Sequence, residues 1–162
     1  MYRPIKFFVP QRSDYDCTIA TIAMWTRLEY DQVELVALKN GWSRTSGLLS
    51  GIQDKVLRDL GILPYTLFNN WTGVPGLLSV PSLNVEGGAH AVYFDGQHII
   101  DPQRGRSGKK AYGAQLKGLW PGCCRITVDL REEHSMFVAQ MEYKQMRSRL
   151  VEAGVKVEET IQ

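Results

Sequence analysis

The chain has 162 residues, enough for one domain, since domains cluster at roughly 100–150 residues. Its hydrophobic fraction of 44% and charged fraction of 22% are those of an ordinary globular protein. A formal net charge of only +2 indicates neither a nucleic-acid-binding protein nor an acidic one. No stretch approaches the ~20 apolar residues of a membrane helix, and residues 1–10 lack the apolar run of a signal peptide. We therefore expect a soluble, cytoplasmic protein with no nucleic-acid or membrane partner.

The cysteines point to a reducing compartment. Cys123 and Cys124 are adjacent, a spacing that rarely suits a structural disulfide, which leaves Cys17 standing alone. The adjacent pair is interpreted as core thiols at the start of a strand, with redox activity as the alternative. His98 and His134 have no partner at metal-ligand spacing, so the sequence assigns no metal and no cofactor.

Three stretches in the first half of the chain show apolar residues at helical spacing, each after a residue that commonly caps a helix. The expected helices are 17–28 after Asp14 or Asp16, 32–39 after Asp31, and 47–60 after Ser46. Gly61 is expected to end the third helix, because a left-handed C-terminal residue suits glycine best.

The pattern then becomes extended. The expected strands are 62–68, 76–80, 89–94, 98–100 and 125–130, with a short helix at 112–119. Asp95-Gly96 predicts a tight hairpin between the third and fourth strands, because both turn positions tolerate positive φ. Helices first and strands afterwards predict an α+β domain with N-terminal helices packed on an antiparallel sheet.

Residues 1–130 are expected to form this domain, and 131–162 a helical extension with a tail. The extension carries an apolar stripe at two-heptad spacing, made of Met136, Ala139, Tyr143, Met146 and Leu150. We interpret the stripe as a face packed on the body of the same domain. The alternative is a face that forms a homodimer or docks on a partner.

Cys17 opens the first expected helix. A helix N-terminus presents unpaired backbone N–H groups and about half a positive charge, which lowers the pKa of a thiol and favours the nucleophilic thiolate. The alternative is a buried structural cysteine. Gln11 lies six residues before Cys17 across a polar loop, and its amide can fold back beside the sulfur. Together with the Cys17 backbone N–H it would form an oxyanion hole.

His90 and Asp101 lie on the two strands of the expected hairpin. Pairing outward from Asp95-Gly96 sets His90 directly across from Asp101, and cross-strand Cβ atoms lie about 5 Å apart. At that distance a carboxylate can accept from the imidazole N–H and fix its tautomer. Taken singly, His90 could be a strand-end histidine and Asp101 a turn residue before Pro102.

A basic loop follows Asp101, with Arg104, Arg106, Lys109 and Lys110 among glycines. We interpret it as a solvated loop. The alternative places it at the rim of a cleft, where it would attract an acidic peptide or protein.

These motifs resemble a known family. The run 9–17 before an Ala- and Met-bearing helix is similar to the nucleophile segment of the peptidase domains of bacteriocin-processing transporters. That family is papain-like and cleaves leader peptides after a double glycine. Residues 88–92 and 99–102 resemble its histidine strand and Asp-Pro motif, and the resemblance spans 9–105. It implies the following roles: Cys17 as nucleophile, His90 as general base and acid, Asp101 as its orienter and Gln11 as oxyanion donor.

Two departures from the family bear on the substrate. Thr18 stands where the family has glycine directly after the nucleophile, and the transporter parts are absent. Asp101-Pro102-Gln103 also resembles the papain-fold toxin and protein-glutaminase group, which deamidates glutamine on the same triad. We expect a cysteine peptidase-like amide hydrolase acting on a peptide or protein. The alternatives are a glutamine deamidase or acyl-transferring modifier, and a non-catalytic binding module that retains the fold.

Overall fold

The computed structural model describes residues 7–68, 74–113, 125–132, 145, 148–149 and 151–154. The chain divides into two compact units, Met1–Leu130 and Arg131–Gln162. Several sequence predictions fall outside the described residues: the Met136–Leu150 stripe, the role of Cys123 and Cys124, His134, and all of the 112–119 helix except Tyr112 and Gly113, which are not helical.

Three helices open the first unit, α1 (Cys17–Thr26), α2 (Tyr30–Lys39) and α3 (Ser50–Asp59). The helix α1 is buried on nearly every side, from Thr18 to Trp25, which explains why its sequence carries small and apolar residues with almost no charge. It ends where Arg27 adopts the left-handed conformation, with φ 60°.

The N-terminal caps of all three helices differ from those predicted. Asp16 occupies the N-cap position of α1, but its side chain makes no capping hydrogen bond. In α2 the N-cap is Glu29 and not Asp31, and the Glu29 N–H donates to Oε1 of Gln32 at 3.0 Å. The helix α3 begins at Ser50 and not after Ser46, because residues 47–49 stay non-helical. Gly61 does follow the end of α3 in the predicted left-handed conformation, with φ 84°.

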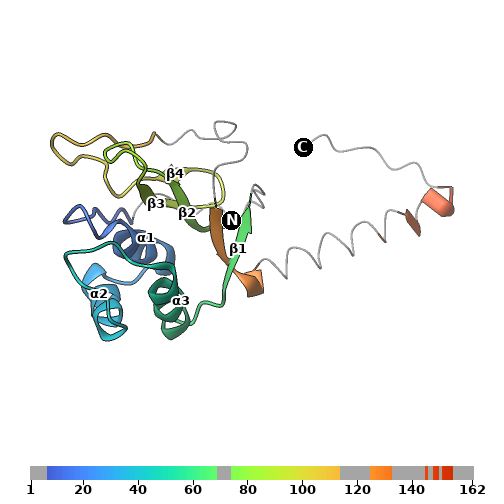
Figure 1. The fold of residues 1–162 in the computed structure, drawn as a ribbon. Helices are drawn as coiled ribbons and strands as arrows, with labels where there is room; N and C mark the ends of the chain where they lie inside the picture. Colours follow the sequence, from blue (N-terminus) through green and yellow to red (C-terminus); the bar gives the residue numbers. More distant parts are fainter. Residues whose placement is uncertain are drawn as a thin grey trace. The chain divides into compact units, whose positions relative to one another are not determined.

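The sheet has five antiparallel strands, so the α+β class is confirmed. The strands are β1 (Pro64–Phe68), β2 (Gly76–Pro81), β3 (Ala89–Phe94), β4 (Ile99–Ile100) and β5 (Arg125–Asp129). Their order across the sheet is β1-β5-β2-β3-β4 (Figure 1). The strand β5 therefore lies between β1 and β2, although it comes last of the five in sequence.

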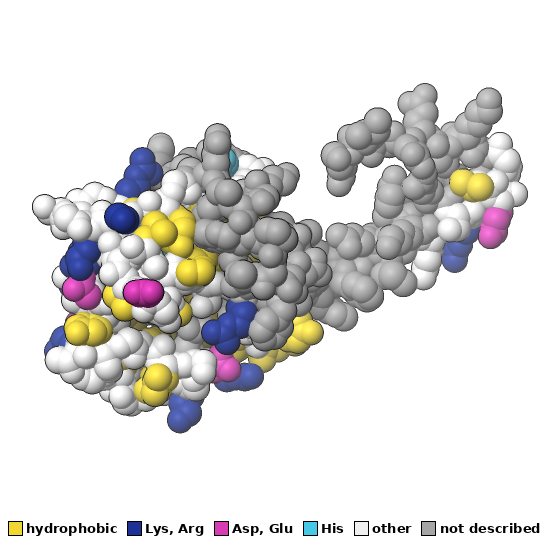
Figure 2. Space-filling view, turned by 45° about the horizontal axis from the view of Figure 1, so that its top comes forward, with side chains coloured by type: hydrophobic (Ala, Val, Ile, Leu, Met, Phe, Trp, Pro, Cys, Tyr) yellow, Lys and Arg dark blue, Asp and Glu magenta, His cyan; other side chains and the backbone are white. Residues whose placement is uncertain are grey.

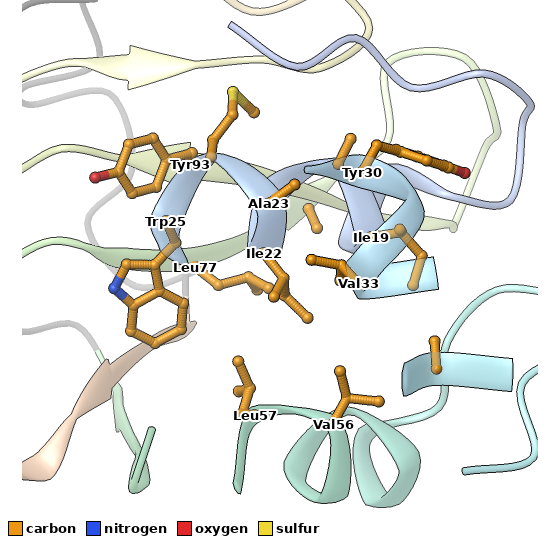
Figure 3. Close-up of a cluster of buried hydrophobic side chains, with 14 of the residues drawn as sticks. Ile19, Ile22, Ala23, Trp25, Tyr30, Val33, Val56, Leu57, Leu77 and Tyr93 are labelled. Atoms are coloured by element: carbon orange, nitrogen blue, oxygen red, sulfur yellow. The ribbon is translucent and has the colours of Figure 1, made fainter. Parts of the chain in front are cut away.

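Apolar side chains pack on both faces of the sheet. On one face, α1 contacts Leu77, Ala91 and Tyr93 of the sheet. Buried side chains of α2 and α3 pack against the other side of α1 (Figure 3). On the opposite face a second cluster combines residues of β2 to β5, namely Leu78, Val80, Val92, Phe94, Ile99, Ile126 and Val128, with Val74. The helix α1 is thus the central element of the domain, with the sheet on one side and the other two helices on the other.

The β3–β4 hairpin is confirmed, but its predicted register is wrong by two residues. Tyr93 pairs with Ile100 and Phe94 with Ile99, so the turn centres on Gly96 and Gln97. The reason is the Asp95 side chain, whose Oδ1 accepts from the N–H groups of Gln97 at 2.8 Å and His98 at 2.6 Å. Asp95 thereby becomes the first corner of the turn, and only Gly96 needs a positive φ, at 102°.

Among the residues that the structure describes, no helix is both long and apolar enough to span a bilayer. On the face seen in Figure 2, apolar side chains form small groups separated by charged and polar ones.

Candidate active site

His90 and Asp101 are joined by a short hydrogen bond. Nε2 of His90 lies 2.7 Å from Oδ1 of Asp101, and both side chains are largely shielded from solvent, with 11% and 1% exposed. In the observed register Asp101 continues opposite Val92, so it is a diagonal neighbour of His90 and not its direct partner. Diagonal pairs are still within reach of long side chains. The predicted contact is therefore present through a different geometry.

The Asp101 carboxylate is fixed by two backbone donors besides His90. The N–H of Gln103 donates to Oδ1 and the N–H of Tyr112 donates to Oδ2, each at 2.8 Å. Three donors on this buried carboxylate leave it no freedom to rotate. Asp101 can therefore hold the His90 ring in one orientation.

Cys17 lies beside His90 at the start of α1. Burial alone would raise the pKa of the Cys17 thiol, but the hydrogen bond and positive charge of His90 outweigh it, so this pKa is lowered. Burial likewise lowers the pKa of His90, but the bonds to Asp101 and Cys17 raise it to about 9. Both shifts favour a thiolate–imidazolium pair at neutral pH, the reactive form of a catalytic cysteine.

Neighbouring groups support the thiolate and its position. The backbone of Ala91 and the side chain of Thr18 also lower the pKa of Cys17 through hydrogen bonds. Thr18 is thus a partner of the sulfur, which gives a physical role to the residue that departs from the family pattern. One helical turn further, the Thr21 hydroxyl donates to the Ala91 carbonyl at 3.2 Å. This buried bond ties the cysteine helix to the strand that carries His90.

The loop before Cys17 is organised by the buried carboxylate of Asp16. Oδ2 accepts from the Arg12 N–H and the Tyr30 hydroxyl, both at 2.7 Å, and Oδ1 accepts from the Ser13 N–H at 3.0 Å. Burial and the hydrogen bond to Asp16 raise the pKa of Tyr30, so its hydroxyl remains a donor. Asp16 therefore shapes the loop instead of capping the helix.

Gln11 is buried in the same loop, with 4% of its surface exposed. Its Nε2 donates to the Ser13 carbonyl at 2.7 Å, and its backbone N–H donates to Pro102 at 3.0 Å. The bond to Ser13 uses one of the two amide protons, and the other has no partner among the described residues. Gln11 is not among the residues that line the cleft beside Cys17. The structure thus brings Cys17, His90 and Asp101 together, and holds Gln11 in the adjoining loop.

Most of the basic loop is exposed, as the solvated-loop interpretation predicted, but two of its basic side chains pack against the loop before Cys17. Nη1 of Arg106 contacts the Ser13 carbonyl at 2.9 Å, Oδ1 of Asp14 at 3.0 Å and Oε1 of Gln103 at 2.7 Å. Nζ of Lys109 lies 3.1 Å from the same Asp14 oxygen. Hydrogen bonds from Lys109 and then Arg106 lower the pKa of Asp14. Of the four basic residues, these two face the neighbouring loop.

A cleft of about 280 Å³ opens beside the cysteine and histidine. Residues of α1, α3, the segment before α3 and the sheet line it: Cys17, Thr18, Gly47, Leu48, Ser50, Gln53, Asp54, Thr66, Leu77, Ser79, Ala89, His90, Ala91, Arg125 and Thr127. Its lining combines polar and apolar surface, and the small residues near His90 leave room for an extended chain. The non-helical Gly47 and Leu48 form part of its wall.

The contacts that Asp16, Arg106 and Tyr112 make at the site were not predicted from the sequence. Tyr112 and Arg106 act across loops whose path no local pattern predicts. Asp16 was predicted as a helix cap, but its carboxylate accepts from the N–H groups of Arg12 and Ser13 in the preceding loop. Nothing in a single sequence indicates that Asp16 is buried or that the Tyr112 N–H reaches Asp101.

No protein-family model matches the chain, and no curated protein sequence matches it significantly. A functional assignment therefore rests on the geometry of the site.

Proposed function

We propose that the chain is a cysteine-dependent amide hydrolase with a papain-like fold, and that it cleaves peptide bonds. The observation that carries the proposal is that His90 contacts both Cys17 and Asp101: it lowers the pKa of the Cys17 thiol and lies 2.7 Å from the Asp101 carboxylate. The cleft beside these residues provides space for an extended substrate.

In this mechanism the Cys17 thiolate attacks the amide carbonyl carbon. The backbone N–H groups at the start of α1 have no partner within the helix, and they can stabilise the oxyanion together with the uncommitted Gln11 amide proton. The His90 imidazolium gives its proton to the departing amine, which leaves a thioester on Cys17. His90 then takes a proton from water, which attacks the thioester and releases the acid.

Asp101 supports both proton transfers. Asp101 bonds to Nε2 of His90, so Nδ1 is the ring nitrogen that exchanges protons with Cys17 and the substrate. Asp101 also stabilises the imidazolium that forms before the amine is protonated. The carboxylate need not take up a proton itself.

The first test is the reactivity of Cys17. Iodoacetamide at pH 6 should alkylate Cys17 faster than Cys123 or Cys124, as read by peptide mass spectrometry, because only a low-pKa thiol is ionised there. Equal rates at the three cysteines would contradict the proposal.

The second test is turnover. Incubation with a denatured protein mixture, followed by mass-spectrometric detection of new N-termini, should reveal cleavage that Cys17→Ala abolishes while its circular dichroism is unchanged. Cleavage by Cys17→Ala within about tenfold of the wild-type rate would exclude Cys17 as the nucleophile. Release of ammonia without new termini would replace peptide cleavage by glutamine deamidation on the same triad.

A further inference from the structure

The floor of the cleft is a row of residues that crosses three strands. The sheet register pairs Arg125 of β5 with Ser79 of β2, and Ser79 with Ala91 of β3. All three residues line the cleft, which Cys17 and His90 line as well. Directly paired residues project from the same face of a sheet. Arg125 therefore lies on the same surface as the reactive centre, two strands away from it.

Arg125 differs in its partners from three other arginines of the domain. Arg12 pairs with Asp31, Arg44 with Glu34 and Arg106 with Asp14. Within the described ranges of the chain, Arg125 makes no ion pair, and its side chain is exposed. A guanidinium offers a planar set of donors that matches a carboxylate, and among the described residues no carboxylate of the cleft is in ion-pair contact with it.

Hydroxyl groups surround the same part of the cleft. Ser79 lies beside Arg125 in the register, and Thr127 follows two residues along β5, with its Oγ1 3.3 Å from that of Thr66. These hydroxyls can donate to a second carboxylate oxygen. Apart from the catalytic residues, the remaining charge in the lining is Asp54 of α3, which can accept the N–H groups of a bound peptide.

We propose that Arg125 binds a carboxylate of the substrate, supplied by an acidic side chain or by a free C-terminus. Two inter-strand spacings separate β5 from β3, roughly 10 Å. An extended chain advances about 3.3 Å per residue, so the carboxylate belongs about two to four residues from the attacked amide. This inference rests on the proposed function and specifies its substrate class.

The test uses peptides that carry an electrophile instead of a scissile bond. Iodoacetyl peptides of one to four glycines ending in Glu-amide deliver a carboxylate at increasing distance from Cys17, whose thiolate displaces iodide to form a thioether. Matched probes replace Glu with Gln or Lys. A further pair, an all-glycine peptide acid and its amide, tests the free C-terminus. The readout is the second-order rate of Cys17 alkylation, mapped by mass spectrometry.

At the favoured length we expect the Glu probe to react about tenfold faster than the Gln probe, as a charge-assisted hydrogen bond should provide. Arg125→Glu should reverse the order, so that the Lys probe becomes the fastest. The control is Arg58→Glu, the same charge change on an exposed residue of α3 outside the cleft, and it should keep the preference for Glu. Preference for the peptide acid over Glu-amide would identify a C-terminal carboxylate.

Glu and Gln probes that react within twofold of each other at every length would overturn the inference, as would an unchanged preference in Arg125→Glu. Plain iodoacetamide serves as the reference for the intrinsic reactivity of Cys17. A low iodoacetamide rate contradicts the proposed function, and the ratio of Glu to Gln rates still measures the carboxylate preference. The two failures are therefore distinguishable.

Discussion

Arg106 donates from Nη1 to the backbone carbonyl of Ser13 at 2.9 Å, across 93 residues of sequence. The same carbonyl accepts from the Gln11 amide at 2.7 Å, and the Gln11 N–H donates back to Pro102. The loop that precedes Cys17 is thus fastened to the loop that follows Asp101. The distance between Cys17 and the His90–Asp101 pair depends on these contacts as well as on packing of α1.

Arg106→Ala should therefore lower kcat by about tenfold with little change in KM, because misplacement of reacting groups reduces rate more than binding. Arg106→Lys should recover only part of the loss, since an ammonium cannot reach three acceptors in a plane. The measurement is steady-state cleavage of the fastest peptide found in the turnover screen. Arg104→Ala in the same loop is the control, because that side chain is exposed. Equal effects of the two alanine variants would contradict a positioning role for Arg106.

The pH dependence of cleavage should be bell-shaped. The His90 pKa is raised to about 9, so the imidazolium persists through neutral pH and is lost as the pH rises through that value. The Cys17 pKa is lowered, so the thiolate is lost only on the acid side. Alkylation of Cys17 by iodoacetamide needs the thiolate alone and should show the acid limb without a decline near pH 9.

Asp101→Asn should move the alkaline limb of cleavage to lower pH, because the bond to Asp101 is the largest contribution that raises the pKa of His90. It should also reduce kcat by roughly 10²–10⁴, as loss of the orienting carboxylate does in comparable triads. An unshifted alkaline limb would show that Asp101 does not set the protonation of His90.

Gln11→Ala should lower kcat by roughly 10²–10³, the usual effect of removing one oxyanion donor. The Gln11 amide also donates to the Ser13 carbonyl, and Arg106→Ala removes another donor to that same carbonyl. An oxyanion role therefore predicts a clearly larger loss of kcat in Gln11→Ala than in Arg106→Ala. Losses of the same size in the two variants would indicate that Gln11 only supports the loop.

Gly76 at the start of β2 lies where the sheet leaves no room for a side chain. A Cβ at this position would lie 2.3 Å from the Thr127 carbonyl oxygen, and a backbone atom in a central strand cannot give way cheaply. Gly76→Ala should lower the free energy of unfolding by about 1–3 kcal/mol or more. Gly51→Ala, at a helical position with nothing within 4 Å, should be neutral or gain about 0.5 kcal/mol. Urea denaturation of both variants measures the difference.

Regular patterns in the sequence predicted the α+β class and the positions of the helices and strands, because apolar periodicity and turn residues act locally. The ends of helices and strands were less predictable where a side chain accepts a hydrogen bond from a backbone N–H group. Asp95 folds over its own turn and shifts the hairpin by two residues, and Gln32 moves the start of α2 to Tyr30. Hydrogen bonds of this kind depend on rotamers that a pattern of residue types does not encode.

The contact of His90 with Asp101 was predicted, although from the wrong pairing. A shift of two residues keeps both side chains on one face of the sheet, since side chains alternate with a period of two. A shift of one residue would have separated them. The hydrogen bond from Arg106 to Ser13 could not be predicted in this way, because the two residues lie in loops whose course depends on the complete fold.

The position of β5 between β1 and β2 has a consequence for folding during synthesis on the ribosome. While the chain is being made, β1 and β2 emerge well before the strand that must fit between them. Arg125 and Thr127, which belong to the cleft floor, arrive with that strand. The cleft floor is therefore completed only after Cys17, His90 and Asp101 have been synthesised. Under the proposed function, a nascent chain that ends before β5 should not yet cleave peptides, because Arg125 and Thr127 are missing from its cleft.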